Sequence, residues 1–324
     1  MPSQVSEKPA GPDRPFHRQP FSRLPEQPTR PHPYFRSEAH DLAMESESLG
    51  TLRVHYRTYG AGEPLLLVHG LMTSGYSWRY VLDGLGEHYR LIVPDLPGSG
   101  RSSAPAQRLS VAGLVTWLGE FQTALGLTGG PVVGNSLGGY LVLRHALAQP
   151  TAYSRIVAIH PPAFSEPRLH ALHTALSIPR AEDLFGLWVR RDTARWAHRT
   201  VHYYDDTLKS LEEMREYGDP LKSVQGTRAF AGYLRDVMRP RDFAEFEAEL
   251  IRRGNAGEPF PVPVQLLYSR KDPMVNPAVG DRLVALIPGA RLDRVDRSSH
   301  FVQVDSPGEV TSCVRRFLEP DLPH

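Results

Sequence analysis

The segment GNSLGG, residues 134–139, directly follows the apolar pair Val132-Val133 and opens a stretch with apolar residues at helical spacing. This order predicts a buried strand, a sharp turn and a helix. Such a turn holds Ser136 in a strained backbone conformation that only small neighbours tolerate, which accounts for the three glycines around it. The serine hydroxyl is therefore expected to project at the carboxyl end of a sheet, where it can act as a nucleophile.

Short apolar runs alternate with amphipathic stretches on both sides of this segment, which is typical of a mostly parallel sheet with helices on both faces. The strand pattern stops between about Ser165 and Pro261, where the sequence indicates several helices, and then resumes. We therefore predict an α/β core of residues 41–164 and 262–324, with an inserted helical cap at 165–261. The expected strands are 52–59, 65–69, 91–94, 131–134, 156–160, 262–268 and 292–295.

These features resemble the α/β-hydrolase superfamily, and the resemblance covers the chain from about Leu42 to Leu318. It implies a twisted, mostly parallel sheet flanked by helices, with an inserted cap. In this superfamily the nucleophile is followed along the chain by an acid and then by a histidine. Serine needs a base to take its proton, and that base needs a carboxylate to orient it.

The resemblance places the acid just past the strand that follows the cap, where SRKDP, residues 269–273, supplies Asp272. It places the histidine after the last strand, where RSSHF supplies His300. Asp305 is a rival for the acid, although its position is more typical of a residue that caps or anchors the closing helix. The expected catalytic residues are Ser136, Asp272 and His300.

Stabilisation of an oxyanion requires two backbone N–H groups directed at the developing negative charge. Leu137, which follows the nucleophile, is expected to supply the first. The second should come from HGLM, residues 69–72, where Leu71 is the expected donor and Met72 the close alternative. The resemblance gives His69 a structural role in this turn.

The segment HGLMTSGYSWR, residues 69–79, is similar to the branch that contains haloalkane dehalogenases and epoxide hydrolases. Those enzymes use a carboxylate nucleophile, whereas Ser136 points to acyl chemistry, with water as co-substrate and small or medium hydrophobic carboxylic esters as substrates. The GNS triplet is also similar to the meta-cleavage-product hydrolases, which cut carbon–carbon bonds, although Phe301 stands where many of them carry tryptophan. A non-catalytic ligand-binding protein on the same fold is the third hypothesis.

The cap is expected to close over the serine and to form the wall of a substrate pocket. His160 ends the strand that enters the cap, and Met72 lies in the oxyanion turn, so both are candidate substrate contacts. Four aromatic residues of the cap are further candidates, although aromatic residues at helical spacing often pack inside such a unit. They are Trp188, Trp196, Tyr203 and Tyr204.

The composition and the motifs argue against several classes of binding partner. Lys and Arg total 37 against 36 Asp and Glu, a net charge of +1, so no global field attracts nucleic acid. The glycine-rich residues 94–102 match neither of the phosphate-binding motifs GxxxxGK[ST] and GxGxxG, so no nucleotide cofactor is expected. The histidines are scattered and lack the HExxH spacing of a metal site, so no metal or other cofactor is expected either. The single cysteine, Cys313, and the lack of a signal-like or membrane-spanning apolar run favour a cytoplasmic protein.

Residues 1–40 contain 9 of the 30 prolines and show no helical or strand periodicity. A segment of this composition cannot bury enough apolar surface to order itself. We therefore predict a disordered Pro/Arg-rich tail.

Overall fold

The computed structural model describes residues 15–319 and contains one eight-stranded sheet with the strand order β1-β2-β4-β3-β5-β6-β7-β8. The pairs β1/β2 and β2/β4 are antiparallel and all others are parallel. The α/β fold class is thus confirmed, and each expected strand is present. The strands are β1 (Glu38–Ser46), β2 (Gly50–Tyr59), β3 (Glu63–Val68), β4 (Tyr89–Pro94), β5 (Val132–Asn135), β6 (Ile156–Ile159), β7 (Val264–Ser269) and β8 (Arg291–Val295).

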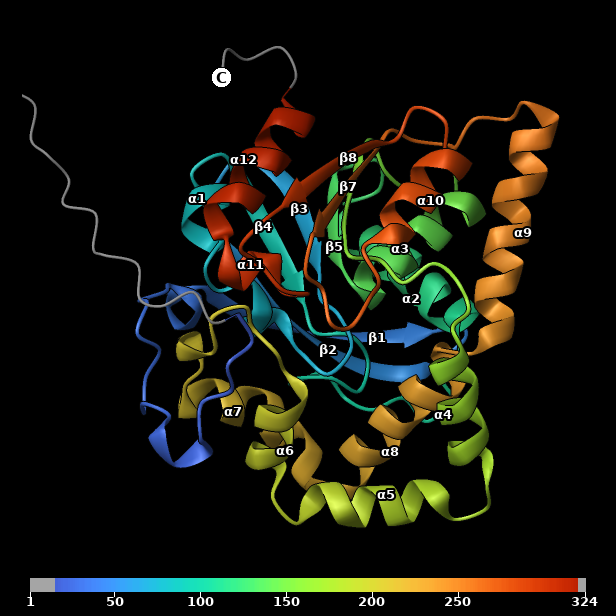
Figure 1. The fold of residues 1–324 in the computed structure, drawn as a ribbon. Helices are drawn as coiled ribbons and strands as arrows, with labels where there is room; N and C mark the ends of the chain where they lie inside the picture. Colours follow the sequence, from blue (N-terminus) through green and yellow to red (C-terminus); the bar gives the residue numbers. More distant parts are fainter. Residues whose placement is uncertain (1–14, 320–324) are drawn as a thin grey trace, which may run out of the picture.

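Two apolar layers enclose the sheet. The central strands β5, β6 and β7 are buried along their whole length, which explains their continuous apolar runs. Along β3, Leu66 and Val68 point into one layer and Leu65 and Leu67 into the other, as the two-residue period of a strand requires. The first layer contains α2 (Val111–Leu125), α3 (Leu137–Ala148) and α10 (Ala278–Leu286), and the second α1 (Leu82–Gly86), α11 (Val302–Asp305) and α12 (Pro307–Leu318), on opposite sides in Figure 1.

Helix α2 illustrates how the sequence sets an element's limits. The Ser110 side chain accepts a hydrogen bond from the N–H of Gly113 and so caps the first turn, as expected. Gly126 ends the helix with φ 65°, a left-handed conformation that favours glycine. Between these caps, a buried apolar stripe faces the sheet.

The helical insertion lies between β6 and β7 and, up to its last helix, runs along the lower edge of the molecule in Figure 1. Its last helix, α9 (Pro240–Ala256), packs against the core, because Phe243 and Phe246 contact Tyr140 of α3. Within the expected cap of residues 165–261, α9 thus packs with the core, and the helices before it form the rest of the insertion. Its helices are α4 (Pro167–Ser177), α5 (Ala181–Arg190), α6 (Thr193–Thr200), α7 (Leu211–Gly218) and α8 (Val224–Gly232), with the short turns η4 (Asp206–Leu208), η5 (Asp219–Lys222) and η6 (Tyr233–Val237).

The prediction of a disordered tail is wrong for residues 15–40, whereas residues 1–14 lie outside the described part of the chain. Beyond the short helices η1 (Phe21–Arg23) and η2 (Tyr34–Arg36), β1 already begins at Glu38. Leu24 and Tyr34 are buried, and the Phe16 N–H donates to the carbonyl of Tyr204 in the cap. A proline-rich segment cannot build a core of its own, but here it packs against both the core and the cap.

Deleting residues 1–36 should lower the melting temperature by about 5 °C or more. The deletion exposes the surface under Leu24 and Tyr34, and burial of each such side chain is worth ~2 kcal/mol. A thermal scan measures the shift, and deletion of residues 1–14 alone provides the matched control. Equal melting temperatures for the two truncations would show that the segment does not stabilise the body.

Each helix within residues 15–319 is too short or too polar to span a lipid bilayer.

Candidate active site

The turn between β5 and α3 holds Ser136 with φ 52° and ψ −121°, an unusual conformation for a residue with a side chain. Close packing enforces it: a Cβ on Gly138 would lie 2.2 Å from the carbonyl oxygen of Val68, and one on Gly134 2.6 Å from the Gly139 nitrogen. Strain of this kind costs ~1–3 kcal/mol and is concentrated at functional sites. The expected strand, sharp turn and helix are therefore present.

Two further residues with side chains have positive φ at neighbouring strand ends. Met72, shortly after β3, has φ 65°, and His160, directly after β6, has φ 49°. Parallel strands bring their carboxyl ends to one edge of the sheet, so these positions and Ser136 fall in one region. This concentration of strain identifies that edge as the candidate site.

Asp272 and His300 meet at the same edge. His300 Nδ1 lies 2.6 Å from Asp272 Oδ2, and both side chains are almost fully buried. The other carboxylate oxygen, Oδ1, accepts hydrogen bonds from the backbone N–H groups of Met274 and Val275. Burial alone would raise the pKa of Asp272, but His300, His160 and their hydrogen bonds hold it well below its usual range. The carboxylate is thus ionised, and it orients His300 with a proton on Nδ1.

The rival acid, Asp305, makes different contacts. Its carboxylate accepts hydrogen bonds from the Ser299 N–H and hydroxyl and from the Tyr204 N–H. It therefore joins the segment before His300 to the cap, while Asp272 holds the imidazole. This geometry favours Asp272 as the acid.

The expected oxyanion donors lie next to Ser136. Leu137 begins α3, so its N–H has no acceptor four residues earlier within the helix. Leu71 and Met72 line the same pocket as Ser136, and a Cβ on Gly70 would lie 2.9 Å from the Ser136 Cβ. The His-Gly turn thus packs directly against the serine.

His69 is locked within this turn. Its Nε2 accepts a hydrogen bond from the Leu96 N–H, which leaves the proton on Nδ1, 2.8 Å from the Gly70 carbonyl oxygen. Burial lowers the pKa of His69 and keeps it neutral. These contacts support the structural role expected of it.

A cavity of about 410 Å³ opens over Ser136 and His300. The cap supplies one wall, through Leu169 and Leu172 of α4 and Leu234 of the π-helical turn η6. Apart from His300, the charged or titratable side chains of the lining are those of Glu166 and Arg168, which form an ion pair at 2.7 Å. The site can therefore accept a hydrophobic group beside the serine. Besides Leu71 and Met72, its remaining lining residues are Gly70, Asn135, Leu137, Pro162, Ala163, Phe164, Met238, Met274, Val275, Val279 and Phe301.

Met72 lines the cavity as expected, but the four cap aromatic residues do not. The Trp188 side chain is on the outer surface and 51% exposed, whereas Trp196 makes edge-to-face contacts with other aromatic rings inside the cap. Tyr203 is buried with its hydroxyl on Glu213, and Tyr204 contacts the Asp305 carboxylate through its N–H. The structure therefore does not place these four side chains at the cavity, because three of the aromatic residues hold the cap together and to the core.

His160, the other expected substrate contact, is also absent from the cavity lining. Its side chain is fully buried, and Nδ1 lies 2.7 Å from Asp272 Oδ2. Asn135, which the sequence analysis did not single out, donates a hydrogen bond from Nδ2 to the His300 carbonyl oxygen. Neither the His160–Asp272 contact nor the Asn135–His300 hydrogen bond can be predicted from a local sequence pattern, because each joins the ends of strands that are far apart in the chain.

Among the described residues, His160, Asp272 and His300 bring three possible metal-ligand atoms within 4.8 Å of one another. The Nδ1 atoms of both histidines lie within 2.7 Å of one carboxylate oxygen, and His160 Nε2 accepts a hydrogen bond from the Ser269 N–H. Contacts among the protein's own groups therefore account for this arrangement.

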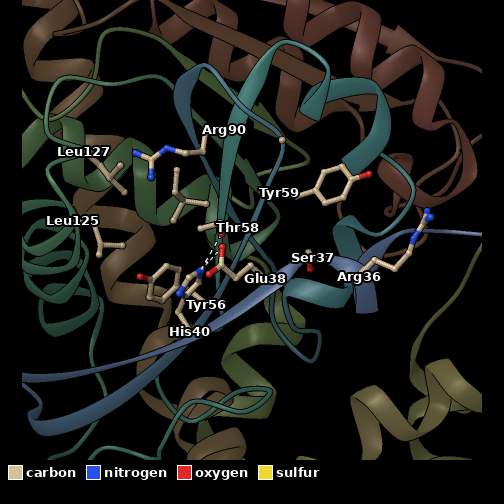
Figure 2. A pocket seen from close by; sticks show the side chains of 12 residues that line it. Arg36, Ser37, Glu38, His40, Tyr56, Thr58, Tyr59, Arg90, Leu125 and Leu127 are labelled. Atoms are coloured by element: carbon tan, nitrogen blue, oxygen red, sulfur yellow. Dashed lines mark hydrogen bonds and ion pairs between the residues drawn. The ribbon is translucent and has the colours of Figure 1, made fainter.

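A second hollow, a groove of about 460 Å³, lies on β1, β2 and β4, and Figure 2 shows its lining. It contains both a serine and a histidine, but they are not paired. The Ser37 hydroxyl donates to the carbonyl of Tyr34, while the His40 ring stacks on Tyr56 and bonds to the Thr58 hydroxyl. The groove thus lacks an activated nucleophile.

Comparisons with known proteins agree with this architecture. A family model described as alpha/beta hydrolase fold matches residues 63–307. An uncharacterized protein of Mycobacterium tuberculosis (strain ATCC 25618 / H37Rv) is 25% identical over 281 residues, covering 83% of this chain and 79% of that protein. The soluble epoxide hydrolase of Corynebacterium sp. (strain C12) is 39% identical over 99 residues, covering 31% of this chain and 35% of that enzyme.

A solved structure of a thermophilic esterase from Thermogutta terrifontis is similar in fold, with a TM-score of 0.69 and 19% identity, covering 87% of this chain and 98% of that one. The match at residues 63–307 includes the strained serine, Asp272 and His300. The chain therefore belongs to the α/β-hydrolase fold family.

Proposed function

We propose that the protein is a serine hydrolase that cleaves small or medium hydrophobic carboxylic esters through an acyl-enzyme. The observation that carries this proposal is the position of Ser136, which lines the same cavity as a buried histidine whose Nδ1 is held at 2.6 Å by Asp272. A serine hydroxyl, an oriented imidazole and an ionised carboxylate are the three parts that activate such a nucleophile.

In this mechanism, His300 Nε2 takes the Ser136 proton as the oxygen attacks the ester carbonyl carbon. Asp272 stabilises the imidazolium that forms, and the Leu137 and Leu71 N–H groups stabilise the oxyanion. The C–O bond to the alcohol breaks as His300 returns the proton to the leaving oxygen. Water then attacks the acyl-enzyme with the same histidine as base and releases the acid.

The nucleophile separates this chemistry from that of the epoxide hydrolases and haloalkane dehalogenases that the chain resembles. Their reaction at sp³ carbon uses a carboxylate nucleophile, whereas the corresponding turn here presents Ser136. A serine alkoxide is suited to an sp² carbonyl carbon. The resemblance therefore extends to the scaffold and cap rather than to the reaction.

The cavity also favours an ester over the diketone acid of a carbon–carbon hydrolase. Such an acid carries a carboxylate and an acidic enol, so it needs cationic partners in the pocket. The arginine of the lining, Arg168, is already paired with Glu166 at 2.7 Å, and most other lining residues are apolar. An uncharged ester with a hydrophobic acyl group fits this lining without an unpaired buried charge.

Treatment with a fluorophosphonate probe tests the proposal without knowledge of the substrate. The probe reacts with activated serines, so it should label the wild-type protein at Ser136 and leave Ser136→Ala unlabelled. A wild-type protein that stays unlabelled while its cavity admits an apolar fluorescent ligand would favour a ligand-binding protein instead.

Short-chain p-nitrophenyl esters should be hydrolysed faster than long-chain esters, because a cavity of about 410 Å³ under a cap limits acyl length. Leu172→Ala should shift the preference toward longer acyl chains, since it removes part of the cap wall. Measured kcat/KM values across an acyl series check this, with Leu187→Ala on the outer cap surface as control. A preference for a vinylogous diketone acid of more than about a hundredfold would overturn the ester assignment.

A further inference from the structure

His160 lies beneath the candidate active site, on the carboxyl end of β6. Its side chain is fully buried, and its backbone has the strained value φ 49°. The ring packs edge-on against Tyr268, with ring centroids 4.9 Å apart, and its centroid lies 5.3 Å from that of His300. Strain of this kind persists only where the surroundings hold it in place, so the contacts of the ring indicate what it does.

Two contacts fix the tautomer of this ring. The Ser269 N–H donates to His160 Nε2 at 2.9 Å, so Nε2 carries no proton and Nδ1 carries it. Nδ1 lies 2.7 Å from Asp272 Oδ2, in a bent contact rather than a straight hydrogen bond. Burial lowers the pKa of His160, and His300 and Arg294 act in the same direction, whereas Asp272 opposes them. The ring is therefore neutral, and its Nδ1–H lies next to the carboxylate without forming a well-aligned hydrogen bond to it.

The Asp272 carboxylate is surrounded by N–H groups on both oxygens. Oδ1 accepts hydrogen bonds from two backbone N–H groups. Oδ2 is hydrogen-bonded to His300 Nδ1 at 2.6 Å and lies 2.7 Å from His160 Nδ1, whose N–H is near it but poorly aligned. The side chains of Asp272 and His160 are both fully buried, so bulk water does not reach the carboxylate beside His160. Removing the His160 N–H would take a partial positive charge away from the buried carboxylate, so the carboxylate would interact more strongly with the remaining imidazole, that of His300.

We propose that His160 is a positioning residue. This second histidine holds Asp272 Oδ2 in place and partly offsets the negative charge that Oδ2 presents to His300. His300 thereby keeps both its orientation and its strength as a base. This inference rests on the proposed serine hydrolase function. His160 acts through Asp272 and does not touch the substrate cavity.

Four charged or titratable groups among the described residues are neighbours of His160. Asp272 and His300 approach it from the loops after β7 and β8, and Arg294 of β8 acts at longer range. Tyr268 of β7 faces it through its ring and uses its hydroxyl on the Pro161 carbonyl. Asp272 is thus the group through which His160 influences His300.

The variant His160→Ala should lower kcat about 10- to 100-fold with little change in KM, because it weakens orientation of the base and leaves the cavity lining intact. The acid limb of kcat/KM against pH should move upward by about 1 unit. With one donor fewer, the carboxylate attracts the imidazolium more strongly, so His300 releases its proton at higher pH.

Two conservative variants separate the two contacts of the ring. In His160→Asn the amide nitrogen replaces Nδ1 and keeps a donor for Asp272. In His160→Gln the amide oxygen replaces Nε2 and keeps an acceptor for the Ser269 N–H. Asn should restore the wild-type pH midpoint and most of kcat, while Gln should behave like His160→Ala. Asn also tolerates positive φ, so melting temperatures are measured separately and the pH midpoint decides.

Equal pH profiles for the Asn and Gln variants, or an unchanged kcat and profile in His160→Ala, would overturn the inference. If the alanine variant does not fold, the Asn and Gln pair still gives the answer. Fluorophosphonate labelling distinguishes this failure from that of the proposed function. A wild-type protein that labels at Ser136, with His160 variants that match it in rate and pH profile, refutes only the role of His160. A wild-type protein that neither labels nor hydrolyses esters refutes the function itself.

Discussion

Replacing Ser136 or His300 by alanine should lower kcat by about 10⁴- to 10⁶-fold while leaving the melting temperature within a few degrees of wild type. The serine is the nucleophile of the proposed mechanism, and the histidine takes its proton, so neither works without the other. The double variant should consequently be little slower than either single variant. Steady-state hydrolysis of a p-nitrophenyl ester measures the rates, and a double variant slower by the product of both losses would contradict a shared mechanism.

The two carboxylates provide an internal control for this experiment. Asp272→Asn removes the acceptor at 2.6 Å from His300 Nδ1 and favours the wrong tautomer, so kcat should fall by about 10⁴-fold. Asp305→Asn disturbs the contacts to Ser299 and Tyr204 instead, and it should act mainly on stability. A larger loss of kcat in Asp305→Asn than in Asp272→Asn would show that the acid is misassigned.

The core strands and the turn at Ser136 could be predicted because their signals are local. A fully buried parallel strand needs a continuous apolar run, and a turn with φ 52° at Ser136 needs small neighbours. Asp272 and His300 were placed by chain order within a resembled family, and the structure brings them to 2.6 Å. In each case a short segment of sequence carries the information.

The features that escaped prediction depend on contacts between distant segments. Residues 15–36 have the composition of a tail, yet Tyr34 is only 1% exposed because Tyr76 and Arg57 of the core pack around its ring. Trp196 is an aromatic residue of the cap and was therefore a candidate for the pocket wall, but its ring packs against Phe230 within the cap. The contact of His160 with Asp272 joins the ends of two strands separated in sequence by the whole cap. Periodicity identifies which residues are buried, but not which partner buries them.

The largest stability effect is expected at the buried ion pair between the core and the cap. Arg79 Nη2 lies 3.1 Å from Glu213 Oε1, and both side chains are 0% exposed. The Arg79 guanidinium also lies over the rings of Tyr76 and Tyr80. Burial alone would lower the pKa of Arg79, but the Glu213 carboxylate raises it well above its ordinary value, so the arginine stays charged. A fully buried ion pair between Arg79 and Glu213 thus joins the cap to the core.

Glu213→Ala should cost about 3–5 kcal/mol of unfolding free energy, because it leaves the Arg79 charge buried without its partner. Chemical denaturation measures the loss, and Glu245→Ala, which breaks the exposed pair with Arg241, should change it by about 0.5 kcal/mol or less. The double variant Arg79→Met/Glu213→Leu removes both charges and should recover most of the stability, since desolvation of the pair offsets much of its attraction. A double variant as unstable as Glu213→Ala would mean that the shape of this junction, rather than its charge balance, holds the cap on the core.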